Sequence, residues 1–525
     1  MAETTKPLPT PAEDSTKIRA EQPDDLRRLV EIIQDTHTEE LILSLCGFIG
    51  TDIHMVSKRL KHILENTFDY PTEVIFLSDQ IKERYDGAKG MTKENTSYYD
   101  YTRKLIEGGN ALREKYENAI LAELAVQKIA YDRHKERGEG TAFKPRRRCY
   151  IIDSIKNDKE LELLRIVYRD IHYAIGVFSS MDIRRARLKS KQLKEAEIDT
   201  LIDRDSNEDI RHGQKVRDTF TQSDFFLRLD SYSMDELDNR LERFLHLIFS
   251  TKVITPTVEE TAMYQASSAA GNSACLSRQV GAALTDAGGE VLSIGWNDVP
   301  RADGGLYTTT LSDPLGKKDN RCFNIGMGCW NDKEKNQIAH ELVDSLIDEE
   351  LIAESMRPEA YEKIRKSKIK ELVEFSRAVH AEMHAIITGC IHAGGKVRGG
   401  MLFVTTYPCH NCARHIIVAG IKKVYYIEPY TKSLTTKLHA DAITENENYK
   451  EKVTILMYDG IAPSRYLQLF KMYNHKRKDA TGSGEAIEPN LKTAKPKTTL
   501  SLEAIPVLEM TVAEQLKRKG LEIKL

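Results

Sequence analysis

The stretch that decides the fold reads HAEMHAIITGCIHA over residues 380–393 and MLFVTTYPCHNCARHIIVAGIKKVYYIE over residues 401–428. Its apolar pattern predicts a helix over 380–393, a strand over 401–406, a helix over 409–419 and a strand over 423–428. Strands that alternate with helices in this way are typical of an α/β sheet. We therefore expect an α/β unit in the second half of the chain.

Three potential metal ligands lie in this stretch, namely His380, Cys409 and Cys412. Zn²⁺ prefers four tetrahedral ligands, and a catalytic zinc site leaves one of the four positions for water. Cys409 and Cys412 are three residues apart at a predicted helix start, which puts both sulfur atoms on one face and favours the thiolate form. Pro408 suits that helix start because it has no N–H to leave unsatisfied. The spacing predicts a zinc centre.

A carboxylate follows the first of these ligands by two residues, at Glu382. Zinc lowers the pKa of a bound water towards about 7, so a carboxylate beside it can act as a general acid and base. We expect Glu382 to have this catalytic role and not to bind the metal. The alternative is a structural zinc knuckle without chemistry, but such a site usually has four protein ligands.

The full pattern H-x-E…P-C-x-x-C is the signature of zinc-dependent nucleobase deaminases. The surrounding sequence resembles the deoxycytidylate deaminase family. The matching stretches are SRQVGA (277–282), GWNDVP (295–300), HAEMHAI (380–386), TTYPCHNC (405–412), EPYTKS (428–433) and GIAP (460–463). The resemblance implies a cytidine deaminase-like α/β/α sandwich that binds Zn²⁺ and replaces the C4 amine of cytosine, with Glu382 protonating ring N3.

The resemblance also implies where the substrate binds. Asn297 is the Asn of the G-x-N stretch and is expected to hydrogen-bond the sugar or base. Arg278 and Lys432 are expected phosphate contacts, although each basic residue could equally be a solvated surface charge. The family often has Asn four residues after the zinc His, where this chain has His384. His384 is expected near the substrate, in the surroundings of the ligands, or in the core.

A second cysteine pair lies at Cys322 and Cys329, within the segment RCFNIGMGCW (321–330). Together with a histidine such as His340, the pair could hold a structural zinc ion. The other interpretation is two unpaired thiols in a loop. The sequence leaves this choice open.

Residues 25–250 resemble P-loop nucleotide kinases, with a strand, a turn and a helix over 41–64. A working phosphate-binding turn needs glycines followed by Lys-Ser or Lys-Thr. Here the turn reads Gly47-Phe48-Ile49-Gly50-Thr51-Asp52, with no such Lys and with an acidic residue that would repel phosphate. We expect no normal phosphoryl transfer. If this domain binds a nucleotide, Gly47, Gly50, Thr51 and Arg184 are the expected contacts.

Composition divides the chain further. We expect a disordered tail over 1–24, a kinase-like domain over 25–250, a deaminase domain over 255–475, a linker over 476–500 and a docking tail over 501–525. The formal charge of −3 argues against a protein that mainly grips a nucleic-acid backbone. No apolar run approaches the ~20 residues needed to span a bilayer, and the first residues lack the apolar core of a secretory signal. These features indicate a cytoplasmic protein with no membrane contact.

The order of a kinase-like domain and then a deaminase resembles bacterial anti-phage dCTP/dCMP deaminases. That resemblance implies hydrolysis of dCTP and/or dCMP to dUTP or dUMP plus ammonia, which depletes the dCTP pool during infection. It also implies a homo-oligomer, a hexamer among the forms, and regulation by a dNTP or RNA. The first alternative is a cytosine deaminase of DNA or RNA, which needs a basic, aromatic groove. The second is a zinc-stabilised nucleotide or RNA sensor without turnover.

Overall fold

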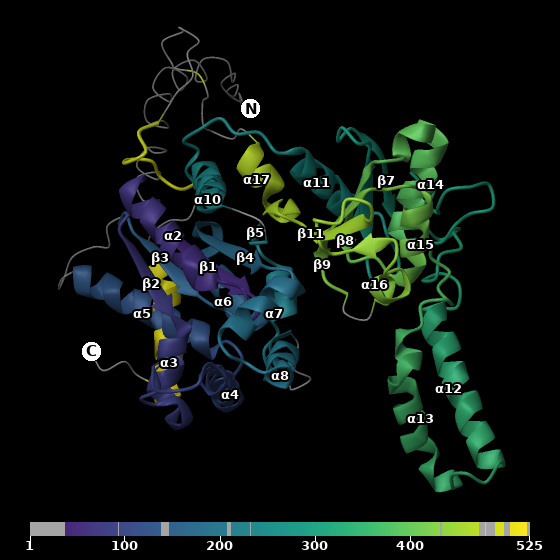
Figure 1. Cartoon of the computed structure of the whole chain (residues 1–525), viewed down its shortest axis with the longest axis horizontal. Helices are drawn as coiled ribbons and strands as arrows, with labels where there is room; N and C mark the ends of the chain where they lie inside the picture. The colour runs from purple at the N-terminus through teal and green to yellow at the C-terminus, as the bar shows by residue number, and fades with distance from the viewer. Residues whose placement is uncertain are drawn as a thin grey trace, which may run out of the picture.

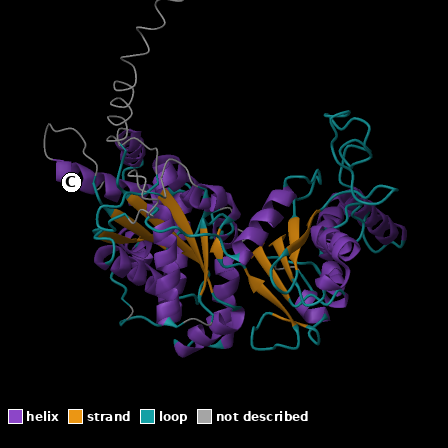
Figure 2. Cartoon of the chain, turned by 90° about the horizontal axis from the view of Figure 1, so that it is seen from above, coloured by secondary structure: helices purple, strands orange, loops and turns teal. Residues whose placement is uncertain are grey.

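The computed structural model describes residues 37–92, 94–137, 146–206, 212–230, 233–430, 433–471, 478, 489–497 and 504–521. The predicted tail over 1–24 lies outside this part of the chain, as does most of the predicted linker over 476–500. Two α/β units, each built on its own sheet, lie side by side (Figures 1 and 2). The predicted fold class, a parallel α/β domain followed by an α/β/α sandwich, is confirmed by both sheets.

The first unit, here called the N-terminal unit, has five parallel strands in the order β2-β3-β1-β4-β5. The strands are β1 (Leu41–Gly47), β2 (Thr72–Phe76), β3 (Cys149–Asp153), β4 (His172–Phe178) and β5 (Phe225–Arg228). Every residue of β1, β3 and β5 is buried, because helices cover both faces of the sheet.

Nine α-helices in the described residues belong to this unit. They are α2 (Ile53–Asn66), α3 (Leu77–Arg84), α4 (Tyr98–Tyr116), α5 (Ile120–Arg137), α6 (Asp158–Tyr168), α7 (Met181–Ser190), α8 (Glu195–Ser206), α9 (Val216–Phe220) and α10 (Met234–Phe249). Apolar residues of α2 and α10 pack on one face of the sheet, with Leu41, Leu43 and Leu45. Those of α5, α6 and α9 pack on the other face, with Ile42 and Cys46.

The second sheet has the order β10-β11-β9-β8-β6-β7. Its strands are β6 (Gly281–Thr285), β7 (Val291–Trp296), β8 (Met401–Thr406), β9 (Lys423–Glu428), β10 (Ile443–Thr444) and β11 (Val453–Met457). Strand β6 runs antiparallel to both of its neighbours, and the other pairs are parallel. The strands and helices expected over 380–428 are therefore present, with bounds shifted by one residue at α14 (Ala381–Ala393) and α15 (His410–Val418).

Helix α11 (Val258–Ala270) packs on one face of this sheet and α14 on the other. The short α16 (Thr435–Leu438) follows β9. Between β7 and α14 the chain forms a helical hairpin of α12 (Trp330–Asp348) and α13 (Arg357–Lys366), which projects away from the sheet (Figure 1).

The segment after β11 returns to the N-terminal unit. Strand β12 (Gly460–Ile461) pairs antiparallel with β5 and becomes the sixth strand of the first sheet. Arg465 then donates to Asp224 at 2.9 Å, and α17 (Tyr466–Phe470) lies beside α10. The two sheets are thus joined by main-chain hydrogen bonds as well as by side chains.

Helix α18 (Ala504–Arg518) packs against α5, within the segment expected to be a docking tail. Its Glu509 is buried and accepts a hydrogen bond of 2.8 Å from Arg133 and one of 3.1 Å from Tyr168. None of the described helices is long and apolar enough to cross a bilayer.

Two glycines allow helices to approach the second sheet closely. A Cβ at Gly281 would lie 1.9 Å from the carbonyl oxygen of Ala266 in α11. A Cβ at Gly295 would lie 2.5 Å from both the carbonyl oxygen of Ala381 and the nitrogen of Ala385 in α14. Only glycine fits such contacts with backbone atoms, so Gly295 sets the distance between β7 and the first turn of α14.

Replacing Gly295 by alanine should therefore displace α14 from the sheet. We expect Gly295→Ala to lower the free energy of unfolding by about 1–3 kcal/mol, the usual cost of overpacking, and to lower the bound metal per chain. Urea denaturation and metal analysis would measure both effects. Gly395→Ala is the matched control, because a Cβ there has no neighbour within 4 Å. Equal stability of the two variants would contradict this account of Gly295.

Candidate active site

The three predicted metal ligands come together at the starts of two neighbouring helices. His380 directly precedes α14, and Cys409 directly precedes α15. Cys412 lies in the first turn of α15 and is fully buried. The loop that leaves β8 carries Cys409 to this position, so sheet order and helix starts together bring the three side chains to one place.

The ligand atoms have the spacing of a metal shell. His380 Nδ1 lies 3.4 Å from Cys409 Sγ and 3.3 Å from Cys412 Sγ. A tetrahedral zinc shell with bonds of about 2.0–2.3 Å separates neighbouring ligand atoms by roughly 3.5 Å. All three atoms lie within 4.8 Å of one another, and no other such group occurs in the described part of the chain. One nitrogen and two sulfur ligands suit Zn²⁺, so the residues fit the ion.

Thiolates are the form of cysteine that binds metals. A hydrogen bond from Cys412, helped by His380, lowers the pKa of Cys409 to about 4. The shift favours the thiolate form of Cys409.

Glu382 lies in the first turn of α14, with only 4% of its surface exposed. Burial raises the pKa of its carboxyl above the usual value. It lines the same cavity of about 840 Å³ as His380 and Cys409. The cavity is thus lined by two of the three potential metal ligands and by a buried carboxyl group beside them.

Residues 256–428 match the family model described as the cytidine and deoxycytidylate deaminase zinc-binding region. The matched residues include strands β6, β7, β8 and β9 of the second sheet and the three potential metal ligands. We call the second sheet, with the helices packed on it, the deaminase unit.

Several known proteins are similar to parts of this chain. ComE operon protein 2 of Bacillus subtilis (strain 168) is 49% identical over 55 residues, which are 10% of this chain and 29% of that protein. The deoxycytidylate deaminase of Enterobacteria phage T2 is 40% identical over 55 residues, with the same two shares. The match thus spans less than a third of either relative. The crystal structure of the dCMP deaminase of cyanophage S-TIM5 with dCMP and dUMP is 20% identical, covers 39% of this chain and 99% of that one, and has a TM-score of 0.22.

Two of the residues expected to bind substrate line the cavity of the deaminase unit. The Asn297 side chain accepts from the N–H of Val280 at 2.7 Å and donates to the carbonyl oxygen of Arg278 at 2.8 Å. It therefore fixes the loop that carries Arg278. The Arg278 guanidinium lies 3.0 Å from a carboxylate oxygen of Glu428 and is about half exposed. The third residue, Lys432, lies outside the described residues.

His384 faces the sheet. Its Nδ1 accepts a hydrogen bond of 3.2 Å from the N–H of Trp296, and its ring meets the Trp296 ring edge-on at 4.7 Å. Burial lowers the pKa of this imidazole. His384 therefore joins α14 to β7 and lies outside the metal-binding triad.

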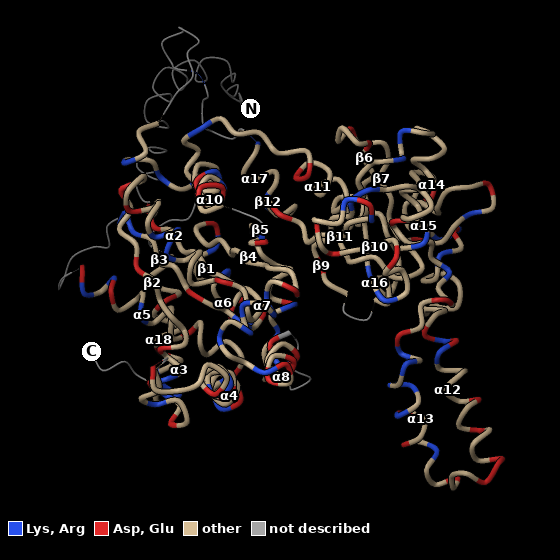
Figure 3. Tube along the Cα trace, in the orientation of Figure 1, with Lys and Arg blue, Asp and Glu red and all other residues tan. Residues whose placement is uncertain are grey.

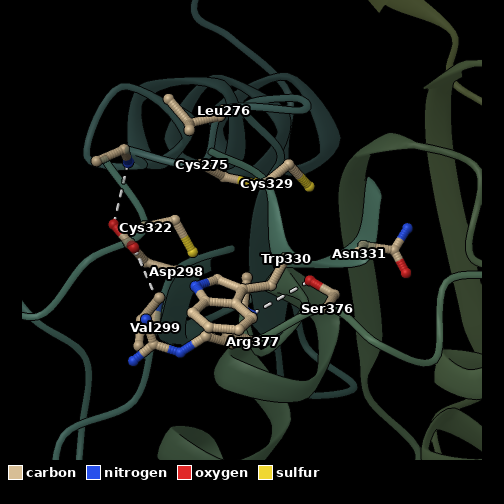
Figure 4. Close-up of a pocket in the computed structure, with 12 residues that line it drawn as sticks. Cys275, Leu276, Asp298, Val299, Cys322, Cys329, Trp330, Asn331, Ser376 and Arg377 are labelled. Atoms are coloured by element: carbon tan, nitrogen blue, oxygen red, sulfur yellow. Dashed lines mark hydrogen bonds between the residues drawn. The ribbon is translucent and has the colours of Figure 1, made fainter. Parts of the chain in front are cut away.

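Cys322 and Cys329 lie beside a third thiol that the sequence did not single out. Both residues and Cys275 line a small cavity of about 20 Å³ (Figure 4). His340, the histidine considered as a partner, instead stacks on Tyr361 at 4.3 Å, between α12 and α13. A second zinc site at this pair stays a prediction.

Sequence motifs missed one wall of the active-site cavity. The hairpin of α12 and α13, with the turn after it, contributes Asn331, Lys335, Arg365, Lys366 and Lys370. These residues lie between the stretches that carry the family resemblance. The only signal in the sequence is a run of basic residues in a long helical segment, which is usually a solvated surface.

The turn after β1, where a kinase would bind phosphate, is filled by the chain itself. The Asp205 carboxylate, only 1% exposed, accepts from the N–H of Ile49 at 2.6 Å and from Lys156 Nζ at 2.8 Å. Lys156 Nζ also donates to the carbonyl oxygen of Gly47 at 2.7 Å. A main-chain N–H and a lysine are the groups that hold phosphate in such a turn. Here they hold an aspartate.

The remaining residues considered for nucleotide binding are also hydrogen-bonded within the chain or buried. Arg184 is buried, donates from Nε to the carbonyl oxygen of Ile49 at 2.7 Å and covers the Phe48 ring. Gly50 has a φ of +83° and packs against the Arg184 backbone. The Thr51 hydroxyl is buried without a partner. Binding of a nucleotide through these residues stays a prediction, and it would require displacing Asp205.

Removal of the Asp205 carboxylate should open this turn to an anion. We expect Asp205→Ala to lower the free energy of unfolding by about 3–5 kcal/mol, since Lys156 loses its buried partner. Millimolar inorganic phosphate should restore part of this stability in the variant and change the unaltered protein less. Thermal and urea unfolding would measure both effects. Asp199→Ala is the control on the same helix, because its pair with Arg185 is exposed. A phosphate effect of equal size with and without Asp205 would contradict the expectation.

Proposed function

We propose that this chain is a zinc-dependent hydrolase that deaminates free deoxycytidine nucleotides, converting dCTP and/or dCMP to dUTP or dUMP plus ammonia. The observation that carries the proposal is one cavity lined by His380, Cys409 and the buried Glu382, with Cys412 buried within metal-binding distance of His380 and Cys409. The family match over 256–428 supports the cytidine-type chemistry.

Each residue of the site has a role in this reaction. His380, Cys409 and Cys412 would hold the zinc ion, which supplies a water molecule of lowered pKa as the nucleophile. Glu382 accepts a proton from this water and delivers it to ring N3. The water oxygen adds to C4, and Glu382 then carries the second proton of this water to the exocyclic nitrogen. The bond from C4 to that nitrogen breaks, and the nitrogen leaves as ammonia. Water is consumed, so the step needs no other reactant.

The shape of the cavity favours a free nucleotide over a strand. A volume of about 840 Å³ lies within the usual range of about 300–1,000 Å³ for small-molecule sites. Its walls carry both basic and acidic side chains, whereas strand-binding proteins present a basic groove with stacked aromatic rings. The formal charge of −3 also favours a free nucleotide over a nucleic-acid strand as the substrate.

We further propose that the reaction drains the dCTP pool of an infected bacterial cell, with the N-terminal unit as a regulatory or scaffolding part. The support for this role is the resemblance of the whole domain order to anti-phage deaminases. Dependence on a dNTP or RNA, assembly into a homo-oligomer and a cytoplasmic location belong to the same proposal. Measuring dCTP in phage-infected cells that express the unaltered chain or a Glu382 variant tests the role.

The chemistry is tested by replacing the carboxylate while keeping its shape. We expect Glu382→Gln to lower ammonia release from dCTP and dCMP by at least about 10²–10⁴-fold, the usual contribution of a general acid–base. The zinc content should stay near that of the unaltered protein, because Glu382 is not a ligand. Ammonia assays with dCTP, dCMP and a single-stranded oligonucleotide, together with metal analysis, give the result.

Glu290→Gln is the control for that experiment, since Glu290 is exposed and its carboxylate lies 3.8 Å from the likewise exposed Lys396. Full activity of Glu382→Gln would refute the catalytic role of the carboxylate. Ammonia release from the oligonucleotide alone would favour a nucleic-acid deaminase over our proposal. A biological effect that survives Glu382→Gln would favour the alternative of a zinc-stabilised nucleotide or RNA sensor without turnover.

A further inference from the structure

The wall of the deaminase cavity formed by the α12–α13 hairpin carries an unusual lysine. Lys335 is only 6% exposed and lines the cavity together with Glu382 and His380. Its ammonium group donates one hydrogen bond, to the carbonyl oxygen of Lys370 at 3.1 Å. In the described part of the chain no carboxylate lies within 4.0 Å of it. An ammonium group has three N–H donors, and burying a charge without a counter-ion is costly.

A second unsatisfied group lies on the same face of α12. Asn331 precedes Lys335 by one helical turn and also lines the cavity. Its amide nitrogen donates to the carbonyl oxygen of Leu372 at 3.0 Å, but its buried Oδ1 has no hydrogen-bond partner. Two adjacent side chains with unused hydrogen-bonding capacity indicate that this face of α12 contacts something other than the protein.

The other basic residues of the cavity wall differ from Lys335. Arg365 lies 2.9 Å from a carboxylate oxygen of Asp332, and Arg278 lies 3.0 Å from one of Glu428. Lys366 pairs with Glu362 at 2.7 Å and is largely exposed, and Lys370 is exposed. Charged residues of both signs lie along the hairpin (Figure 3). Lys335 is thus a buried cation of this wall that forms no ion pair within 4.0 Å in the described part of the chain.

We propose that Lys335 binds a phosphate group of the nucleotide and that α12 thereby selects nucleotides over nucleosides. This inference rests on the proposed function. Phosphate oxygens accept charge-assisted hydrogen bonds, and a phosphate in the cavity would supply the negative charge that Lys335 lacks. Burial lowers the pKa of Lys335 and Asp332 opposes this shift only in part, so a phosphate in the cavity would oppose it further.

A purely structural role for Lys335 is the competing explanation. Its hydrogen bond to Lys370 ties α12 to the turn at 368–371. Loss of that hydrogen bond would lower activity on all substrates alike. Loss of a phosphate contact would lower activity only on substrates that carry phosphate. Comparing dCMP with deoxycytidine, which lacks the phosphate, therefore separates the two roles.

The test uses Lys335→Gln in the full chain, because glutamine retains an N–H donor for Lys370 but removes the charge. We expect kcat/KM for dCMP to fall about 10- to 100-fold, the usual effect of losing a hydrogen bond to a charged group. The fall should arise mainly from KM, with kcat/KM for deoxycytidine unchanged. Lys335→Arg should recover part of the loss. Lys333→Gln is the matched control, since Lys333 lies on α12 and also donates to a backbone carbonyl, that of Gly326.

A measurement on the unaltered protein covers the case in which a variant fails to fold. Inorganic phosphate should inhibit dCMP turnover competitively and leave deoxycytidine turnover unaffected. If Lys335→Gln lowers activity on both substrates equally, or on neither, or if phosphate does not compete with dCMP, the inference is wrong. If the unaltered protein releases no ammonia from any deoxycytidine compound, the proposed function fails instead. If deoxycytidine turnover is too slow to measure, dCMP kinetics separate the two roles. A change mainly in KM supports the phosphate contact, and a change mainly in kcat contradicts it.

Discussion

The deaminase unit depends on one contact, that of His380 Nδ1 with the sulfur atoms of Cys409 and Cys412 at 3.4 and 3.3 Å. These atoms belong to two helix starts that the sheet must hold at a fixed distance. Gly295 permits α14 to lie directly on β7, and the hydrogen bond from Trp296 to His384 fixes its rotation. His384, which stands where the family often has Asn, thus helps to position helix α14, which carries Glu382 and begins directly after His380.

The sequence predicted those features of this arrangement that depend on neighbouring residues. Ligand spacing, Pro408 before a helix and the alternation of helix and strand over 380–428 depend on residues near one another in the chain, and the structure has the corresponding elements. Strand β12 was not predicted, because it has only two residues and exists through its pairing with β5. The pairing of His340 with two cysteines was considered on spacing alone, and its stacking on Tyr361 follows from a helical hairpin that spacing does not describe.

The other features that the sequence did not predict depend on contacts between residues that are distant in the chain. The degenerate turn after β1 was recognised from its missing Lys-Ser or Lys-Thr, but no local feature indicates that Asp205 fills it from a helix more than 150 residues further along the chain. Lys335 was equally inconspicuous, because one lysine in a charged helical segment is usually solvated. Its significance arises only from burial at a cavity that also contains Glu382. In each case the decisive quantity is the charge balance of a buried group, which depends on the whole fold.

The half-buried Lys156 and the buried Lys335 show how the two units meet the same physical requirement, an anionic partner for a cation removed from water, in different ways. Lys156 has its anion within the chain, since Asp205 lies 2.8 Å away and also accepts the main-chain N–H of Ile49. The turn that would bind phosphate in a kinase is therefore electrostatically complete, and a phosphate would have to displace a bound carboxylate. In the described residues no carboxylate lies within 4.0 Å of Lys335, so an anionic ligand would supply the partner that Asp205 supplies to Lys156. Under the proposal for Lys335, the cavity of the deaminase unit therefore binds the phosphate of the nucleotide. The N-terminal unit is joined to the deaminase unit through β12 and Arg465.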